Sequence, residues 1–256
     1  MLTAYLTSTR SLLQLPGSNS TSLYSDTDLT RFINTARGQV AGEGGCIRLH
    51  GSLSTVVGTD NYQFSAIGTG TPATNGIQGV IRIDSMHCVA GIGQVWMTPR
   101  PWPWFSLYNR NNPVPPQGQP TEWAQYGQGG APPPAIAPSG GSVQGGTFYV
   151  SPVPDDIYQL NCNTICYPVA LVDDTTVEAL PYFWTDAVPF FAAYFALMSA
   201  QTNARMADAA QMYKGHYNEF MTRARNQSNP DVNNWIYQQS GDPAQATKMG
   251  IKGGGQ

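Results

Sequence analysis

Apolar and polar positions along the chain follow helical spacing near both ends and strand-like spacing between them. Residues 2–15 repeat leucines at helical intervals until a Pro-Gly pair, and residues 174–226 return to helical spacing. Between residues 46 and 173 the apolar positions alternate or form short runs, divided by clusters of Gly, Pro and Asn. The pattern predicts helices at both ends and roughly six to eight strands between them.

The clearest predicted helix covers residues 25–45. Ser25 is a good N-cap, because its hydroxyl can accept a hydrogen bond from a first-turn N–H that has no helical partner. One apolar stripe at helical spacing consists of Leu29, Phe32, Ile33, Ala36 and Val40. We expect Arg31 and Arg37 to lie off this stripe, and the glycines that follow Val40 to end the helix.

The run TDAVPFFAAYFALMSA, residues 185–200, is almost free of polar side chains. Its apolar part is about 14 residues long, whereas a membrane span needs ~20, so the run predicts a buried helix rather than an anchor. A helix that is apolar all round must be covered on every side. The amphipathic segment 205–225 can cover one side, and the apolar stripe between Leu29 and Val40 can cover another. We expect the remaining side chains, Phe190, Tyr194 and Leu197, to face the β-rich part or another subunit.

The order of these patterns predicts an α+β fold. A helical module formed by the N- and C-terminal segments carries an inserted antiparallel β-rich domain, sandwich-like or barrel-like. We divide the chain into N-terminal helices (1–45), the β-rich domain (46–173), a C-terminal helical pair (174–226) and a flexible tail (227–256). The tail is polar and ends in glycines, which is typical of a segment that orders on a partner.

Charge is scarce in this chain. Charged residues make up 11% of the 256 residues and the formal net charge is −3, against roughly 25% charged residues in an average soluble domain. This argues against a broad electrostatic attraction to nucleic acid or to an anionic membrane. Low charge is typical of surfaces covered in an assembly. A weakly charged monomer, rich in Gly and Pro, remains the alternative.

The residues that usually carry chemistry are few and dispersed. The chain has 4 cysteines and 3 histidines, and no C-x-x-C pair. Cys162 and Cys166 fall on one face of a predicted strand, whereas the neighbours His87 and Cys88 fall on opposite faces. We expect free, mostly buried thiols, no metal and no cofactor.

Catalytic motifs are also missing from the sequence. It lacks the nucleophile elbow, the phosphate loop and the H-E-x-x-H motif, so we predict that the protein is not an enzyme. Two aspartate pairs, at residues 155–156 and 173–174, stand where turns are expected. A hydrolase that uses Asp155 or Asp173 is the enzymatic alternative. The N-terminal residues also lack the basic and apolar regions of a secretory signal.

The aromatic run TPRPWPWFSLYNR places Trp102 and Trp104 on one side of an extended chain. Indole rings near arginines can stack on sugars or bases. They are equally typical of core packing and of subunit interfaces, the interpretation that we favour. The alternative is a carbohydrate- or protein-binding β module of a virion or cell surface, in which Trp102, Trp104 and Trp123 bind the sugar.

Several segments, in the order in which they occur, resemble a viral family. They are YSDTDLTRFINTARGQVAGE, PTEWAQYG, TFYVSPVPDDIYQLNCNTICYPVALVDD and EALPYFWTDAVPFFAAYFALMSAQTNARMADAAQMYKGHYNEF. Together they resemble the head-to-tail adaptor (connector or neck) proteins of tailed bacteriophages. The segment 46–112 matches less clearly.

The resemblance implies a structural virion protein, assembled in the host cytoplasm and located at the head–tail junction. Such adaptors form rings, usually dodecameric, that join the portal protein to a tail or nozzle protein. Double-stranded DNA passes through the lumen without sequence-specific binding, and no membrane is involved. A C-terminal tail commonly inserts into the portal, which makes Met249, Ile251 and Lys252 candidate docking residues. Candidate interface residues are Trp102, Trp104, Phe190, Tyr194 and Leu197.

Overall fold

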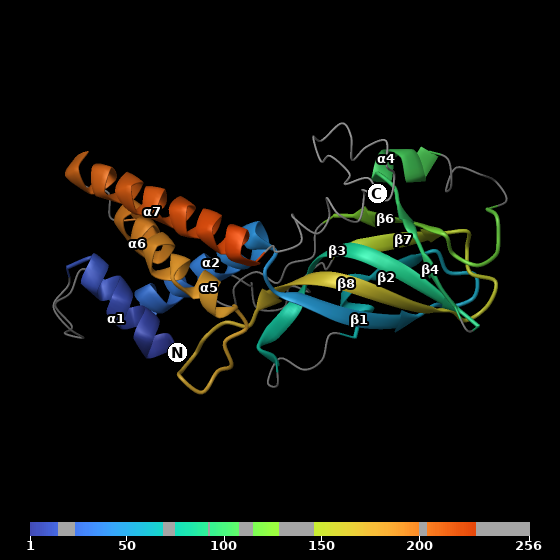
Figure 1. The fold of residues 1–256 in the computed structure, drawn as a ribbon, viewed down its shortest axis with the longest axis horizontal. Coiled ribbons are helices and arrows are strands. Elements are labelled where there is room, and N and C mark those ends of the chain that lie inside the picture. Colours follow the sequence, from blue (N-terminus) through green and yellow to red (C-terminus); the bar gives the residue numbers. More distant parts are fainter. Residues whose placement is uncertain are drawn as a thin grey trace, which may run out of the picture.

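Helices gather at one end of the molecule and two β-sheets at the other (Figure 1). The computed structural model describes residues 1–14, 24–68, 75–91, 93–107, 115–127, 146–199 and 204–228. The helical end consists of α1 (Leu2–Leu12), α2 (Asp26–Gly44), α5 (Tyr182–Thr185), α6 (Ala187–Ser199) and α7 (Ala204–Ser228). Segments from both ends of the chain therefore form the helical part, which confirms the predicted α+β class.

The described residues form eight strands in two four-stranded sheets. The first sheet has the order β1 (Arg48–Ser54), β8 (Gln159–Pro168), β3 (Ile77–Ala90), β4 (Gly93–Trp96), and its neighbours are all antiparallel. The second has the order β2 (Asn61–Gln63), β7 (Thr147–Ser151), β6 (Glu122–Tyr126), β5 (Thr98–Pro99), with β5 parallel to β6. In the described part neither sheet closes on itself, so the arrangement is a sandwich and not a barrel.

Helix α2 begins and ends as the sequence predicts. The Ser25 side chain accepts a hydrogen bond from the Asp28 N–H at 3.1 Å. Gly45 ends the helix in the left-handed conformation, with φ of 56°, which glycine adopts without steric cost. All five residues of the apolar stripe are buried. Arg37 is buried as well, so the prediction that it lies off the stripe is wrong.

Helices α6 and α7 form a hairpin. The ring centroids of Phe191 and Tyr217 are 4.4 Å apart, and those of Phe190 and Phe220 are 5.1 Å apart. A later residue of α7 thus meets an earlier residue of α6, as in an antiparallel pair. Helices α1 and α2 also contact α6, and the Tyr24 hydroxyl donates to the Ala196 carbonyl at 2.6 Å. The apolar run is therefore the central helix of this end, as expected.

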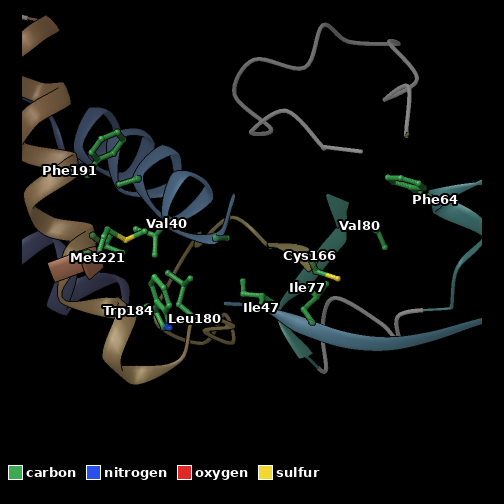
Figure 2. Packing of buried hydrophobic residues seen from close by; sticks show 14 of the residues in the cluster. Val40, Ile47, Phe64, Ile77, Val80, Cys166, Leu180, Trp184, Phe191 and Met221 are labelled. Carbon is green, nitrogen blue, oxygen red and sulfur yellow. The ribbon is translucent and has the colours of Figure 1, made fainter. Parts of the chain in front are cut away.

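One hydrophobic core runs from the helices into the sandwich. Figure 2 shows Val40, Leu180 and Trp184 beside the helices, with Ile47 between them and the sheet residues Ile77 and Cys166. A second link joins the two sheets, because the Ile83 N–H donates to Gln125 Oε1 at 3.2 Å. Ile83 stands at a register shift of the β3–β8 pair, where a β-bulge frees a backbone group from the ladder.

Candidate interaction surfaces

The segment that contains Trp102 and Trp104 is a short helix, α4 (Trp102–Phe105), and not an extended chain as predicted. Its prolines stand at the N-cap and in the first turn, where a helix needs no backbone N–H from them. The Trp102 ring lies 4.6 Å, centroid to centroid, from both Tyr126 and Tyr149. Trp102 is half-buried and packs chiefly against these two tyrosines of the second sheet.

Trp104 packs against the same small cluster as Trp102 and also contacts Arg100. The Arg100 guanidinium lies 4.5 Å from the centroid of the Trp104 ring, and its Nη2 donates to Glu122 Oε1 at 2.6 Å. Trp123 is buried and belongs to the main core. Trp102, Trp104 and Trp123 therefore do not form one sugar-binding platform.

The candidate residues of α6 lie beside α7. Phe190 stacks on Phe220, and the Lys214 ammonium lies 5.5 Å from the Tyr194 ring centroid. Phe190, Tyr194 and Leu197 are all partly exposed. The ring and cation contacts of Phe190 and Tyr194 are with α6 and α7, and contact of these residues with another subunit stays a prediction. The tail candidates Met249, Ile251 and Lys252 lie outside the described residues.

Residues 172–183, which we call the junction segment, expose apolar side chains that the sequence reasoning missed. Val172 and Tyr182 are 78% and 76% exposed, and Phe183 and Val177 are also exposed. The Asp173 carboxylate accepts hydrogen bonds from the N–H groups of Thr175 and Thr176, both at 3.0 Å. The hydroxyls of Thr175 and Thr176 also donate to this carboxylate. The hydroxyl bonds are the largest cause of a lowered Asp173 pKa, and the N–H bonds add to it. In the sequence, the available signal for this exposed surface was the Tyr182-Phe183 pair directly after Leu180-Pro181.

A second contact holds the junction segment to α1. Asp174 Oδ1 accepts from the Met1 amino group at 2.6 Å and from the Thr3 N–H at 2.9 Å. The bond from the amino group is the largest cause of a lowered Asp174 pKa. Both aspartates of this pair thus act as turn residues. The segment that presents Val172 and Tyr182 is anchored by hydrogen bonds at its Asp-Asp turn.

A second apolar surface, the sandwich tip, consists of Val56, Val57 and Ile157. All three are exposed, Ile157 to 69%. Two backbone hydrogen bonds join their loops: Thr55 N–H to the Tyr158 carbonyl at 2.8 Å and Gly58 N–H to the Pro154 carbonyl at 2.9 Å. The carboxylates of Asp155 and Asp156 are exposed beside Ile157, so the sandwich tip is both apolar and acidic.

A buried ion pair joins α2 to the junction segment. Arg37 donates to both carboxylate oxygens of Glu178, from Nε at 3.0 Å and from Nη2 at 2.7 Å. Its Nη1 donates to the Val169 carbonyl at 2.7 Å and to Asn34 Oδ1 at 3.1 Å. Because every side of the guanidinium has an acceptor, the charge can be buried. Sequence spacing gave no signal for this pair, since its members are 141 positions apart.

The described residues contain no group of three or more His, Cys, Asp or Glu side chains that could hold a metal ion. All four thiols are free, as predicted, and burial raises the pKa of Cys162 to about 12. Low thiolate content makes such a thiol a poor nucleophile. Within the described ranges, no helix is both long and apolar enough to cross a membrane.

Exposed apolar side chains in two places of an α+β body are typical of a protein that binds partners. The family model of the SU10 adaptor protein matches residues 4–240, so the chain belongs to this family of phage structural adaptors. Membership implies a place in the virion, contact with portal and tail proteins, and a non-enzymatic role. It confirms the resemblance drawn from the sequence. A comparison with curated proteins gives no match.

Proposed function

We propose that this protein is a ring-forming head-to-tail adaptor, which joins the portal to the tail and lines the channel through which DNA leaves the head. The observation that carries the proposal is the junction segment, an anchored stretch of chain that exposes Tyr182 and Phe183 to solvent. In this proposal residues 1–45 and 174–226 form the helical module, and residues 46–173 form the inserted β domain.

The junction segment has the properties of a subunit interface. Large aromatic side chains supply much of the binding energy in interfaces. The hydrogen bonds of Asp173 and Asp174 order the segment before binding, which lowers the entropy cost of association. A patch that meets a different surface on the next copy makes a head-to-tail contact, and repeated rotation closes such contacts into a ring. We expect a dodecamer.

The remaining surfaces suit partners outside the ring. A net charge of −3 leaves little attraction for DNA, which suits a lumen that lets the genome pass. We assign Met249, Ile251 and Lys252 to portal docking. Five side chains on α4 and α6 are partly exposed, and we assign them to secondary contacts with neighbours: Trp102, Trp104, Phe190, Tyr194 and Leu197.

Light scattering coupled to size exclusion, with native mass spectrometry, tests the ring. We expect the wild-type chain to form a multimer of defined mass, alone or when purified portal is added. The double variant Tyr182→Ser, Phe183→Ser should remain monomeric with an unchanged circular dichroism spectrum. The matched control is Val56→Ser, Val57→Ser, which removes two exposed apolar side chains from the sandwich tip and should still assemble. A wild-type chain that stays monomeric and never binds portal would overturn the proposal.

A further inference from the structure

The outer face of the first sheet, on the side away from the core, is hollowed. The hollow has a volume of about 360 Å³ and spans all four strands. Side chains that line it are His50, Ser52, His87, Gln94, Asn161 and Asn163. They carry imidazole, hydroxyl and amide groups, and none carries a carboxylate, ammonium or guanidinium group. The family assignment does not account for this surface.

The strand register arranges part of this surface in one row. Ser52 lies opposite Asn161, Asn161 opposite His87, and His87 opposite Trp96. The row faces outward, because the neighbouring positions Cys88 and Cys162 are buried on the other side of the sheet. Neighbouring strands are ~4.8 Å apart, so the row is about 14 Å long.

An exposed indole ends the row. Trp96 is 58% exposed, and its ring meets the His87 ring edge to face, with centroids 4.6 Å apart and planes at 90°. This contact fixes the indole beside the hollow while more than half of the side chain stays open to a ligand. Unlike Trp102 and Trp123, Trp96 is not used to fill a core.

Two asparagine side chains that line the hollow, Asn161 and Asn163, are oriented by their neighbours. Gln159 donates to Asn161 Oδ1 at 3.2 Å, and Asn163 donates to Ser85 Oγ at 2.7 Å. Within the described part of the chain, the Asn161 amide nitrogen makes no side-chain hydrogen bond, so its N–H groups remain available to an acceptor. Orientation by a neighbouring side chain is what a site needs before a ligand arrives.

The charge pattern narrows the ligand class. The charges beside the hollow, Arg48 and Asp84, are opposite in sign and 3.9 Å apart, so they offer no net attraction to a phosphate chain. Amide and hydroxyl groups pair well with hydroxyls, and an indole packs well on the C–H face of a sugar ring. A row about 14 Å long accommodates roughly three sugar rings.

We propose that the outer face of the first sheet binds an uncharged oligosaccharide, with Trp96 as the stacking residue and Asn161 as a hydrogen-bonding residue. The site lies on the sandwich, apart from the junction segment, and binding by single chains does not require a ring. Failure of the ring proposal and failure of this one are therefore distinguishable.

The test is a glycan array of neutral hexose and N-acetylhexosamine oligomers, with sialylated and sulfated oligomers beside them, followed by calorimetric titration of each neutral hit. We expect wild-type protein to retain neutral oligomers, and Trp96→Ala to weaken binding about tenfold or more. Asn161→Ala should also weaken it. The matched control is Val95→Ala, next to Trp96 but opposite the buried Cys88 and hence on the other face, which should bind as wild type does.

Each of the following outcomes overturns the proposal. Wild-type protein could retain no neutral oligomer at millimolar concentration, or only the charged ones. Trp96→Ala could bind as tightly as wild type with its spectrum unchanged. Loss of multimers in Trp96→Ala, together with no glycan binding by wild type, would assign the face to a contact between subunits.

Discussion

Gly44 shows how one missing side chain lets two elements of the helical end, α2 and α5, pack closely. It is the last residue of α2, and a Cβ added there would lie 2.5 Å from Cζ3 of Trp184. Real Cβ atoms essentially never come so close, so the Trp184 ring would have to move. Trp184 is among the largest fully buried side chains and belongs to the common core. Close contact between α2 and this ring therefore requires glycine.

Gly44→Ala should lower the free energy of unfolding by about 1–3 kcal/mol, because overpacking a buried ring forces side chains or backbone to shift. Gly42→Ala is the matched control, since a Cβ there meets nothing within 4 Å. It should be neutral or stabilise the protein by up to about 1 kcal/mol, as alanine is the better helix former. Urea unfolding followed by tryptophan fluorescence measures both. Equal effects would show that Trp184 does not pack against Gly44.

The Cys162 thiol makes the free energy of unfolding depend on pH in the alkaline range. Burial raises its pKa to about 12, against about 8.5 for a thiol in an unfolded chain. Between these values the folded protein holds a proton that the unfolded chain releases. The contribution of this thiol to the free energy of unfolding is therefore fully present below pH ~8.5. It falls as pH rises, by at most about 1.4 kcal/mol per pH unit.

Urea unfolding at pH 7.5, 8.5 and 9.5 tests this expectation. The burial-raised pKa values of Cys46, Cys88 and Cys166 add to the same slope. Cys162→Ala should reduce the slope but not abolish it, and should lower stability at every pH because it leaves a cavity. A slope identical to that of wild type would show that the Cys162 thiol ionises as readily in the folded protein as in the unfolded chain.

At the scale of elements, the pairing of α2 with the junction segment decides how the helices sit on the sheets. Arg37 joins Glu178 and the Val169 carbonyl, and Asn34 accepts from the Leu171 N–H at 2.8 Å. Two side chains of one helix thus hold the chain as it leaves β8. Tyr217 adds a link from α7, donating to Glu43 Oε2 at 2.8 Å.

A double-mutant cycle on Arg37 and Glu178 measures this connection. Arg37→Met alone should lower the free energy of unfolding by about 3–5 kcal/mol, because it leaves the Glu178 carboxylate buried without its partner. Glu178→Gln should cost less, since the amide can still accept from the guanidinium. We expect the two changes to couple by more than about 1 kcal/mol in thermal or urea unfolding. Strictly additive effects would contradict the direct pairing.

Elements that depend on local signals were predictable from the sequence. Ser25 and Gly45 mark the ends of α2, and the apolar stripe marks its buried face, because caps and periodicity are properties of neighbouring residues. The burial of Arg37 was not predictable from local signals, since it depends on a carboxylate 141 positions away. The prolines around Trp102 suggested an extended chain, yet they stand where a helix tolerates them.

The candidate surfaces were predictable only in part, for the same reason. Tyr182 is 76% exposed although it belongs to an aromatic run, so hydropathy alone does not predict its exposure. The row that ends at Trp96 exists only through the pairing of four strands. A sequence shows that Trp96 is present, but register decides what lies beside it.

At the scale of the whole molecule, the apolar surfaces are separated. The junction segment lies where the helices meet the sheets, whereas the loops of the sandwich tip lie at the end of the sandwich remote from the helices (Figure 1). In the proposed ring the chain must hold its own copies and its partners at the same time, which separate surfaces allow. The acidic groups of Asp155 and Asp156 beside Ile157 further favour a partner with basic residues at that end.

We therefore predict that variants of the sandwich tip and of the C-terminal segment separate binding of the tail protein from binding of the portal. Val57→Ser with Ile157→Ser should leave the multimer mass and portal binding unchanged, and should abolish co-sedimentation with the tail protein. Deletion of residues 239–256 should do the reverse, with loss of portal binding and retention of tail binding. Raised salt should weaken the tail contact of wild type, because the aspartates at the tip are exposed. If both variants lost the same partner, or if the tip variant changed the multimer mass, the sandwich tip and residues 239–256 would not act separately.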